Sequence, residues 1–389
     1  MDGSAVDWAV YNLANEATKL DEAVVEISLA LLAMLAEDPE TREARDDVVV
    51  TLVEKGAVDP VVMALYNHSD HAGIQGAGAD VVRLIVSPEA VESMVETLVK
   101  AQDAIKDVKH PTEDDIRTVE IPAMALAAFA SWNSAAIIEG GGVKGLVDLL
   151  KWTTAQRNMP RQEEVMSSCL HALKNLAADR DEESAGTLYE WLSVEGGIAA
   201  TSSAVKKHPG LKQVAKAGVE LMGVLALTPD AHAELISNDA VEAAATALKN
   251  NSGSIKLNAA VIEMFDHIVA DPIGAKAVCS RGGVKALVDV LRKKAAQPKW
   301  IDTSVRAMNQ IVNTCSASSA CAGELRKQNI LAGIISVVKD QPDERVFESG
   351  TAAIDALLND EAVRLTMEDL KSTVDQAAAG ELKKLDKLT

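Results

Sequence analysis

The feature that most constrains the fold is a ten-residue junction that occurs twice with nearly the same sequence. Residues 141–150 read GGVKGLVDLL, and residues 282–291 read GGVKALVDVL. The junctions at 197, 239, 283 and 329 are separated by 42, 44 and 46 residues. The interval from 142 to 197 fits one repeat with an insertion, and the interval from 56 to 142 fits two repeats. A period of about 40–47 residues in a helical chain is typical of an α-solenoid.

Each junction has the pattern of two helices joined by a sharp turn. The glycine pair permits the positive φ that such a turn requires. After it, Val143, Leu146, Val147 and Leu150 follow the i, i+3, i+4, i+7 spacing of one apolar helical stripe. Longer helices rich in Ala and Leu are expected upstream of the junctions, at 163–177, 213–226, 257–269 and 301–312. The pattern predicts a repeat made of a short first helix, a second helix that follows the glycine hinge, and a long third helix.

This organisation resembles the armadillo family, most closely at residues 171–177, which read HALKNLA at the end of a third helix. The resemblance covers most of residues 20–360 and implies an all-α fold, a right-handed α-solenoid of armadillo repeats. HEAT repeats are the alternative, and the Gly-Gly junction favours armadillo. We expect a cap helix at 1–20, a solenoid of about 7–9 repeats at 21–362 with loop insertions near 106–118 and 152–161, and a C-terminal capping helix and tail at 363–389.

Composition narrows the function classes. The 389 residues carry a net charge of -20 with 48% hydrophobic residues, which is too apolar for a disordered acidic tail. The same charge argues against a nucleic-acid binder, which would need clustered Lys and Arg. No signal-peptide pattern and no apolar run long enough for a bilayer are present. We therefore expect a cytoplasmic protein that binds neither nucleic acid nor membrane, with the nucleus and the cilium also open.

No sequence motif indicates an enzyme. Gly140, Gly142 and Gly145 match the dinucleotide fingerprint G-x-G-x-x-G. The same hinge recurs at residues 282–283, at the repeat period, with Ala286 in place of the third glycine. That recurrence favours coincidence inside a repeat over a phosphate cradle, which needs a preceding strand. The four cysteines lack the spacing of a zinc site and are expected to be buried thiols, with a Cys315–Cys321 contact across a turn as the alternative. We expect no cofactor and no metal.

The resemblance also implies a set of groove residues. In the armadillo family, an Asn near the end of the third helix lines the concave groove and holds the backbone of an extended peptide. Counting sixteen residues back from each junction gives His267 and Asn313, Asn175 takes the equivalent place, and Val224 interrupts the row. One turn earlier, where the family's nuclear-import receptors have Trp, this chain has His171, Glu263 and Asn309. The candidate groove residues are therefore Asn175, His171, His267, Asn309 and Asn313; the alternative is a set of polar residues on an exposed helical face.

Charge is distributed unevenly along the chain. Residues 1–60 contain 14 acids and 4 bases, which indicates either a docking surface for a basic partner or a solvated polar cap. Two basic clusters fall just after predicted second helices, and we expect them to form a basic ridge for an acidic peptide, or simply to be cations that favour helix C-termini. The members of this ridge are Lys206, Lys207, Arg292, Lys293 and Lys294.

The sequence thus predicts a non-catalytic protein-binding scaffold or adaptor, whose partner is an extended peptide or helix in the concave groove. The alternative is a structural subunit of a large cytoskeletal or ciliary assembly. An enzyme would need a cryptic site in the 106–118 or 152–161 insertions, because the fold alone does not supply chemistry.

Overall fold

The computed structural model describes residues 4–15, 17–39, 41, 44–68, 71–85, 88–108, 110–131, 133–177, 181–294, 297–341 and 343–358. The capping helix and tail expected at 363–389 lie outside these residues. Across the described ranges the ordered elements are 22 α-helices and two short 3-10 helices. The chain is all-α, as the repeat predicts. It divides into two compact units, residues 1–234 and 235–389, and each is described by itself.

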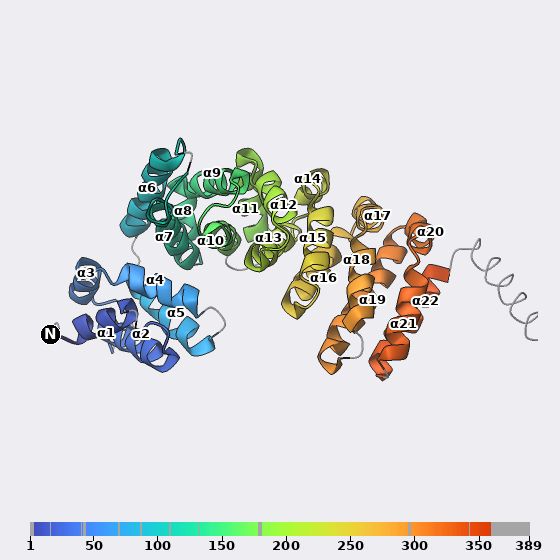
Figure 1. Ribbon diagram of the computed structural model, residues 1–389, viewed down its shortest axis with the longest axis horizontal. Coiled ribbons are helices and arrows are strands. Elements are labelled where there is room, and N and C mark those ends of the chain that lie inside the picture. The colour runs from blue at the N-terminus through green and yellow to red at the C-terminus, as the bar shows by residue number, and fades with distance from the viewer. Residues whose placement is uncertain are drawn as a thin grey trace, which may run out of the picture. The chain divides into compact units, whose positions relative to one another are not determined.

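Unit 1 begins with α1 (Ser4–Ala14) and α2 (Glu22–Ala36), which pack against each other. Groups of three helices follow at α3–α5, α8–α10 and α11–α13, whereas α6 and α7 form a pair of long helices (Figure 1). The first helix is short in α3 and α8, but α11 has 14 residues, as many as α13. Consecutive third helices pack side by side, as α10 does with α7 and with α13. The helices of these groups are α3 (Asp46–Glu54), α4 (Val58–Asn67), α5 (Ala72–Ile85), α6 (Pro88–Ile105), α7 (Glu113–Phe129), α8 (Ser134–Glu139), α9 (Gly142–Ala155), α10 (Gln162–Asn175), α11 (Glu182–Glu195), α12 (Gly197–Lys207) and α13 (Lys212–Leu225).

Unit 2 repeats the same order of helices, and the boundary between the units falls inside α14 (His232–Ser237). The third helices α16, α19 and α22 again lie side by side (Figure 1). The remaining helices are α15 (Ala240–Asn250), α16 (Ile255–Ile268), α17 (Pro272–Ser280), α18 (Gly283–Lys294), α19 (Ile301–Ala317), α20 (Ser319–Lys327), α21 (Ile330–Asp340) and α22 (Glu344–Leu358); the 3-10 helices are Pro229–Ala231 and Pro298–Trp300.

The hinges adopt the backbone conformation that the sequence predicts. Gly141 and Gly282 both have φ +81°, directly before α9 and α18. At two weaker junctions the left-handed residue is Asp239 (φ +61°) or Asn329 (φ +60°), and these short polar types tolerate that region better than most residues do. The repeat register therefore extends through junctions that lack glycine.

The loop at 156–161 is held by a buried ion pair. Arg161 precedes α10 with φ +51°, and its Nη2 donates to Glu120 Oε1 of α7 at 2.6 Å. The Glu120 side chain is only 2% exposed, and pairing with a cation offsets the loss of hydration of a buried carboxylate. The other loop, before α7, ends at Thr112, whose side chain accepts from the Asp115 N–H in a capping box.

The cysteines are buried free thiols, as the sequence suggests, but their arrangement differs from the alternative we considered. The Cys321 thiol of α20 donates to the Ala275 carbonyl of α17 at 3.4 Å and also contacts the Cys279 thiol. The interaction with Cys321, followed by burial, raises the pKa of Cys279. Among the described residues, every helix is too short or too polar to cross a bilayer.

Candidate binding groove

Unit 1 contains a cavity of about 660 Å³ on the face formed by its third helices. That volume lies within the range of ligand pockets, about 300–1,000 Å³. One part of its wall is apolar and the other carries amides, hydroxyls and two lysines. We call this cavity the unit-1 groove; its lining residues are Val62, Leu65, Asn67, Gln75, Ala79, Val82, Met124, Ala127, Ala128, Ser131, Ser167, Ser168, His171, Lys174, Asn175, Gln213 and Lys216.

Two of the groove residues expected from the sequence, Asn175 and His171, line this cavity. Asn175 is the last residue of α10, and its Nδ2 donates to the Ala127 carbonyl at 2.9 Å. Ala127 belongs to the last turn of α7, where carbonyl groups lack an intrahelical partner. Asn175 therefore ties two neighbouring third helices together, while its amide still carries a second hydrogen and an acceptor oxygen.

His171 lies one turn before Asn175 beside a half-buried charge network. Lys174 Nζ is 3.0 Å from Glu220 Oε2, and Lys216 Nζ is 3.9 Å from Glu220 Oε1. Burial lowers the pKa of His171 to about 4, and the charges of Lys174 and Lys216 act in the same direction. Burial opposes ionisation of Glu220, but the charge of Lys174 and its hydrogen bond outweigh it and lower the Glu220 pKa. His171 is thus a neutral hydrogen-bonding group at pH 7.

The floor of the unit-1 groove holds a polar atom without a partner. Ser168 is 1% exposed, and its Oγ has no hydrogen-bond partner among the described residues. Its neighbour Ser167, in contrast, donates to the Glu164 carbonyl at 3.1 Å. A buried hydroxyl without a partner is uncommon in native structures, and here it lies beneath the lining of the cavity.

The other three expected groove residues lie in unit 2. His267 stands in the last turn of α16, and Asn309 and Asn313 are exposed on α19. Asn313 forms a hydrogen bond with Asp266. Desolvation raises the pKa of Asp266, and the bond to Asn313 and the charge of Arg306 offset part of this rise. Asn175 is the last residue of α10, whereas Asn313 lies four residues before the end of α19, and their hydrogen-bond partners differ.

The two basic clusters occupy equivalent places in the two units. Lys206 and Lys207 lie in the last turn of α12, inside the helix rather than after it. Arg292 and Lys293 are exposed near the end of α18, and the side chain of Lys294 lies outside the described residues. Cations favour helix C-termini; the basic ridge stays a prediction.

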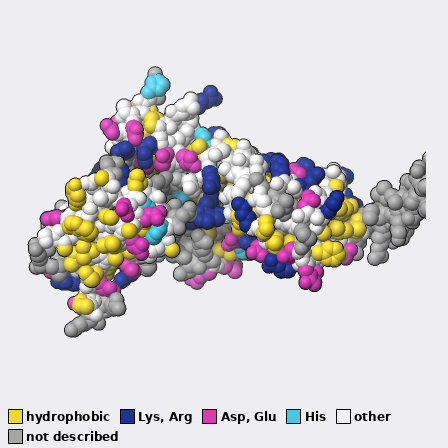
Figure 2. All heavy atoms as spheres, turned by 60° about the horizontal axis from the view of Figure 1, so that its bottom comes forward, with side chains coloured by type: hydrophobic (Ala, Val, Ile, Leu, Met, Phe, Trp, Pro, Cys, Tyr) yellow, Lys and Arg dark blue, Asp and Glu magenta, His cyan; other side chains and the backbone are white. Residues whose placement is uncertain are grey.

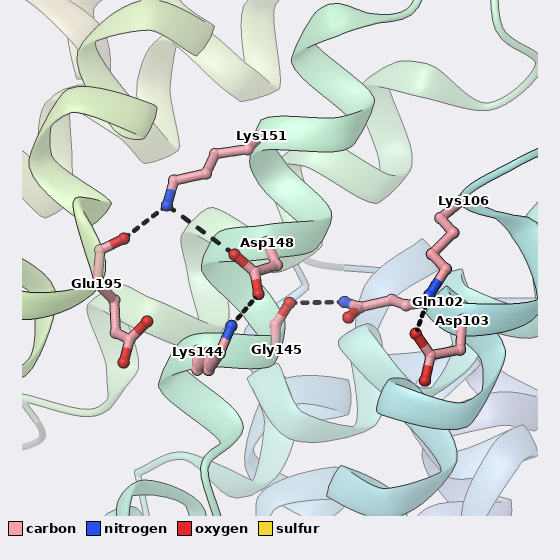
Figure 3. Close-up of polar contacts among 8 residues, drawn as sticks. All are labelled: Gln102, Asp103, Lys106, Lys144, Gly145, Asp148, Lys151 and Glu195. Carbon is pink, nitrogen blue, oxygen red and sulfur yellow. Dashed lines mark hydrogen bonds and ion pairs between the residues drawn. The ribbon is translucent and has the colours of Figure 1, made fainter.

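The glycine motif at 140–145 is a helix hinge. Gly142 starts α9 directly after the helix α8, where a dinucleotide fingerprint would follow a strand. Gly145 faces Leu98 of α6, and its carbonyl accepts a hydrogen bond from Gln102 Nε2 at 2.6 Å (Figure 3).

Charged side chains near this motif form ion pairs and hydrogen bonds on the surface of α9 (Figure 3). Asp148 pairs with Lys144 one turn before it. Lys151 donates to the Glu195 carbonyl at the end of α11 at 2.6 Å. The contacts of Lys151 and Gly145 join α9 to α11 and α6, while the Lys144–Asp148 pair lies within α9.

Comparison with known proteins supports the fold. No family model matches the sequence, and no curated protein matches it significantly. Computationally designed armadillo repeat proteins for modular peptide recognition align with 68% of this chain and 99% of theirs, at 19% identity and a TM-score of 0.50. Two engineered proteins align with 69% and 91% of the chain, and 96% and 98% of their own, at 20% and 16% identity and TM-scores of 0.49 and 0.48. The chain has an armadillo-like repeat fold, an all-α solenoid.

Proposed function

We propose that this protein is a non-catalytic scaffold that holds an extended peptide of a partner protein in the unit-1 groove. The proposal rests on the cavity, which combines an apolar wall with amide and hydroxyl groups from several repeats. Amides both donate and accept hydrogen bonds, so they suit the alternating N–H and C=O groups of an extended main chain. The designed armadillo proteins of similar fold are described as made for modular peptide recognition, which agrees with this use of the fold.

Specific contacts follow from the lining. Asn175 offers its remaining amide hydrogen and its oxygen to the peptide main chain, and neutral His171 offers a further ring nitrogen one turn away. The side of the cavity formed by Val62, Leu65 and Val82 receives an apolar peptide side chain. The expected partner is thus a segment with an apolar anchor, held mainly through its backbone.

A groove-blocking substitution tests this proposal. Ala128 lines the cavity and is partly exposed, so Ala128→Trp fills the groove while leaving the core intact. A displayed library of unstructured 12-residue peptides is selected on the full chain, and the affinity of the selected peptides is then measured by fluorescence polarisation. We expect Ala128→Trp to weaken binding at least about tenfold.

The matched control is Ala352→Trp, at an exposed position of α22 in unit 2. It adds the same side chain to a third helix outside the unit-1 groove, so we expect no change in affinity. Equal affinities of the wild type and both variants would show that the selected peptides bind elsewhere, and the groove would not be the binding site.

A further inference from the structure

The end of unit 1 formed by α1 and α2 exposes large apolar side chains. Figure 2 shows hydrophobic side chains gathered over this end of the molecule. The exposed fractions are 48% for Trp8, 63% for Tyr11, 69% for Leu20, 59% for Ile27 and 67% for Met34. We call these five residues the terminal apolar face. Contiguous apolar surface of this kind marks interaction sites in soluble proteins.

Helix α2 is apolar on two opposite sides. Val25, Leu29 and Leu32 are fully buried on one side. Ile27 and Met34 lie two helical turns apart on the other side, where Ala30 is also exposed. A helix that is hydrophobic all round is normally buried. This face therefore lacks its cover in the isolated chain.

The acidic residues around the terminal apolar face favour a partner that carries positive charge. Neither α1 nor α2 contains a Lys or Arg, whereas α1 carries Asp7 and α2 carries Glu22 and Glu26. Asp7 pairs with Lys55 and Glu22 with His71, but these acids are more than half exposed, so their pairing is weak. With 14 acids and 4 bases in residues 1–60, the field at this end is negative.

We propose that the terminal apolar face docks an amphipathic helix of a partner protein whose polar side is rich in Lys and Arg. The apolar stripe of that helix covers Trp8, Tyr11, Ile27 and Met34, and its cations lie over the acids at the margin. A second copy of this chain would bring a second acidic surface to the interface, and an anionic bilayer would be repelled in the same way. This surface is separate from the unit-1 groove and does not depend on it.

The test selects the partner's chemistry instead of assuming it. We select binders of the full chain from a displayed library of 18-residue helix-forming peptides. Half of the peptides have an apolar stripe at the a and d positions, and the charged residues at the other positions are randomised. We expect the selected peptides to carry the stripe and an excess of Lys and Arg. Their affinity should fall at least about tenfold for Ile27→Glu/Met34→Glu, and should fall with rising salt.

Ile335→Glu is the matched control, since Ile335 is 51% exposed on α21 in unit 2; it should leave the affinity unchanged. Circular-dichroism melting checks that all variants fold, which the exposed positions favour. The proposal would be overturned if the selected peptides were acidic or lacked the apolar stripe. It would also be overturned if they bound the Ile27→Glu/Met34→Glu variant as tightly as the wild type. It would also be overturned if these substitutions abolished self-association of the chain in sedimentation equilibrium, or its binding to phosphatidylcholine vesicles, since either result identifies a different occupant.

Discussion

Each unit carries an asparagine near the end of a third helix, and the two asparagines lie in different environments. In unit 1, Asn175 is half-buried, bonded to the Ala127 carbonyl, and lines a cavity of about 660 Å³. In unit 2, Asn313 is exposed and bonded to Asp266. The repeat register determines where on the helix an amide is placed, while the residues supplied by neighbouring repeats determine what it does. Our predictions therefore treat the two units as internal references for each other.

The largest expected difference concerns the ion pair of unit 1. Arg161→Ala leaves the Glu120 carboxyl, 2% exposed, without its cation and should destabilise unit 1 by about 3 kcal/mol or more. Urea unfolding followed by circular dichroism should show an earlier transition for unit 1 only. Arg345→Ala, which removes exposed pairs with Asp302 and Asp343 in unit 2, should cost less than about 1 kcal/mol. Similar losses in both variants would contradict the burial argument.

The second difference concerns pH. The pKa of His171 is about 4 in the folded chain against an ordinary value of 6.5, so the unfolded state takes up a proton first as pH falls. Stability is therefore complete above about pH 6.5 and declines until pH 4, by at most about 3 kcal/mol. Relative to His171→Leu, the wild type should lose this amount in unit 1 between pH 7 and pH 4, as measured by urea unfolding at each pH. Parallel pH profiles would show that His171 is not buried in solution.

The hinges offer a case where the units should agree. Gly141 and Gly282 share φ +81°, and a Cβ at either would meet no atom within 4 Å. Alanine at each should therefore cost the same amount, about 1–2 kcal/mol, from backbone strain alone. Gly76→Ala in α5, which also meets no atom but has an ordinary φ, should instead stabilise by up to about 1 kcal/mol. Unequal costs at 141 and 282 would mean that the two junctions are not structurally equivalent.

The smallest expected difference is between the two asparagines. Asn175→Ala removes the bond to the α7 carbonyl and should destabilise unit 1 by about 1 kcal/mol. Asn313→Ala acts at an exposed position and should change stability by less than about 0.5 kcal/mol. Thermal melting resolves these values. If both changes are neutral, the α7–α10 contact contributes nothing to stability.

The sequence predicts the elements of the fold well because they depend on local periodicity. The third helix expected at 163–177 runs from Gln162 to Asn175, and the hinge glycines have the positive φ that their position requires. The junctions at Asp239 and Asn329 keep the register although glycine is absent. These features are determined within a few turns of helix.

The site is less predictable because its parts come from distant segments. Asn175 and His171 follow from the repeat count, but Gln75 and Gln213 enter the same cavity from helices whose residues lie far apart in the chain. No local signal pairs Glu120 with Arg161, which are separated by 41 residues. The terminal apolar face does have a local signal in the sequence, since α2 is apolar on both sides.

The central claim, that the unit-1 groove holds an extended peptide, is tested most directly by hydrogen–deuterium exchange on the full chain with and without a selected unstructured peptide. The account predicts that bound peptide slows exchange in the last turns of α7 and α10 and at the start of α13, and leaves α1 and α2 unchanged. Protection confined to α1 and α2, or to helices of unit 2, would contradict it.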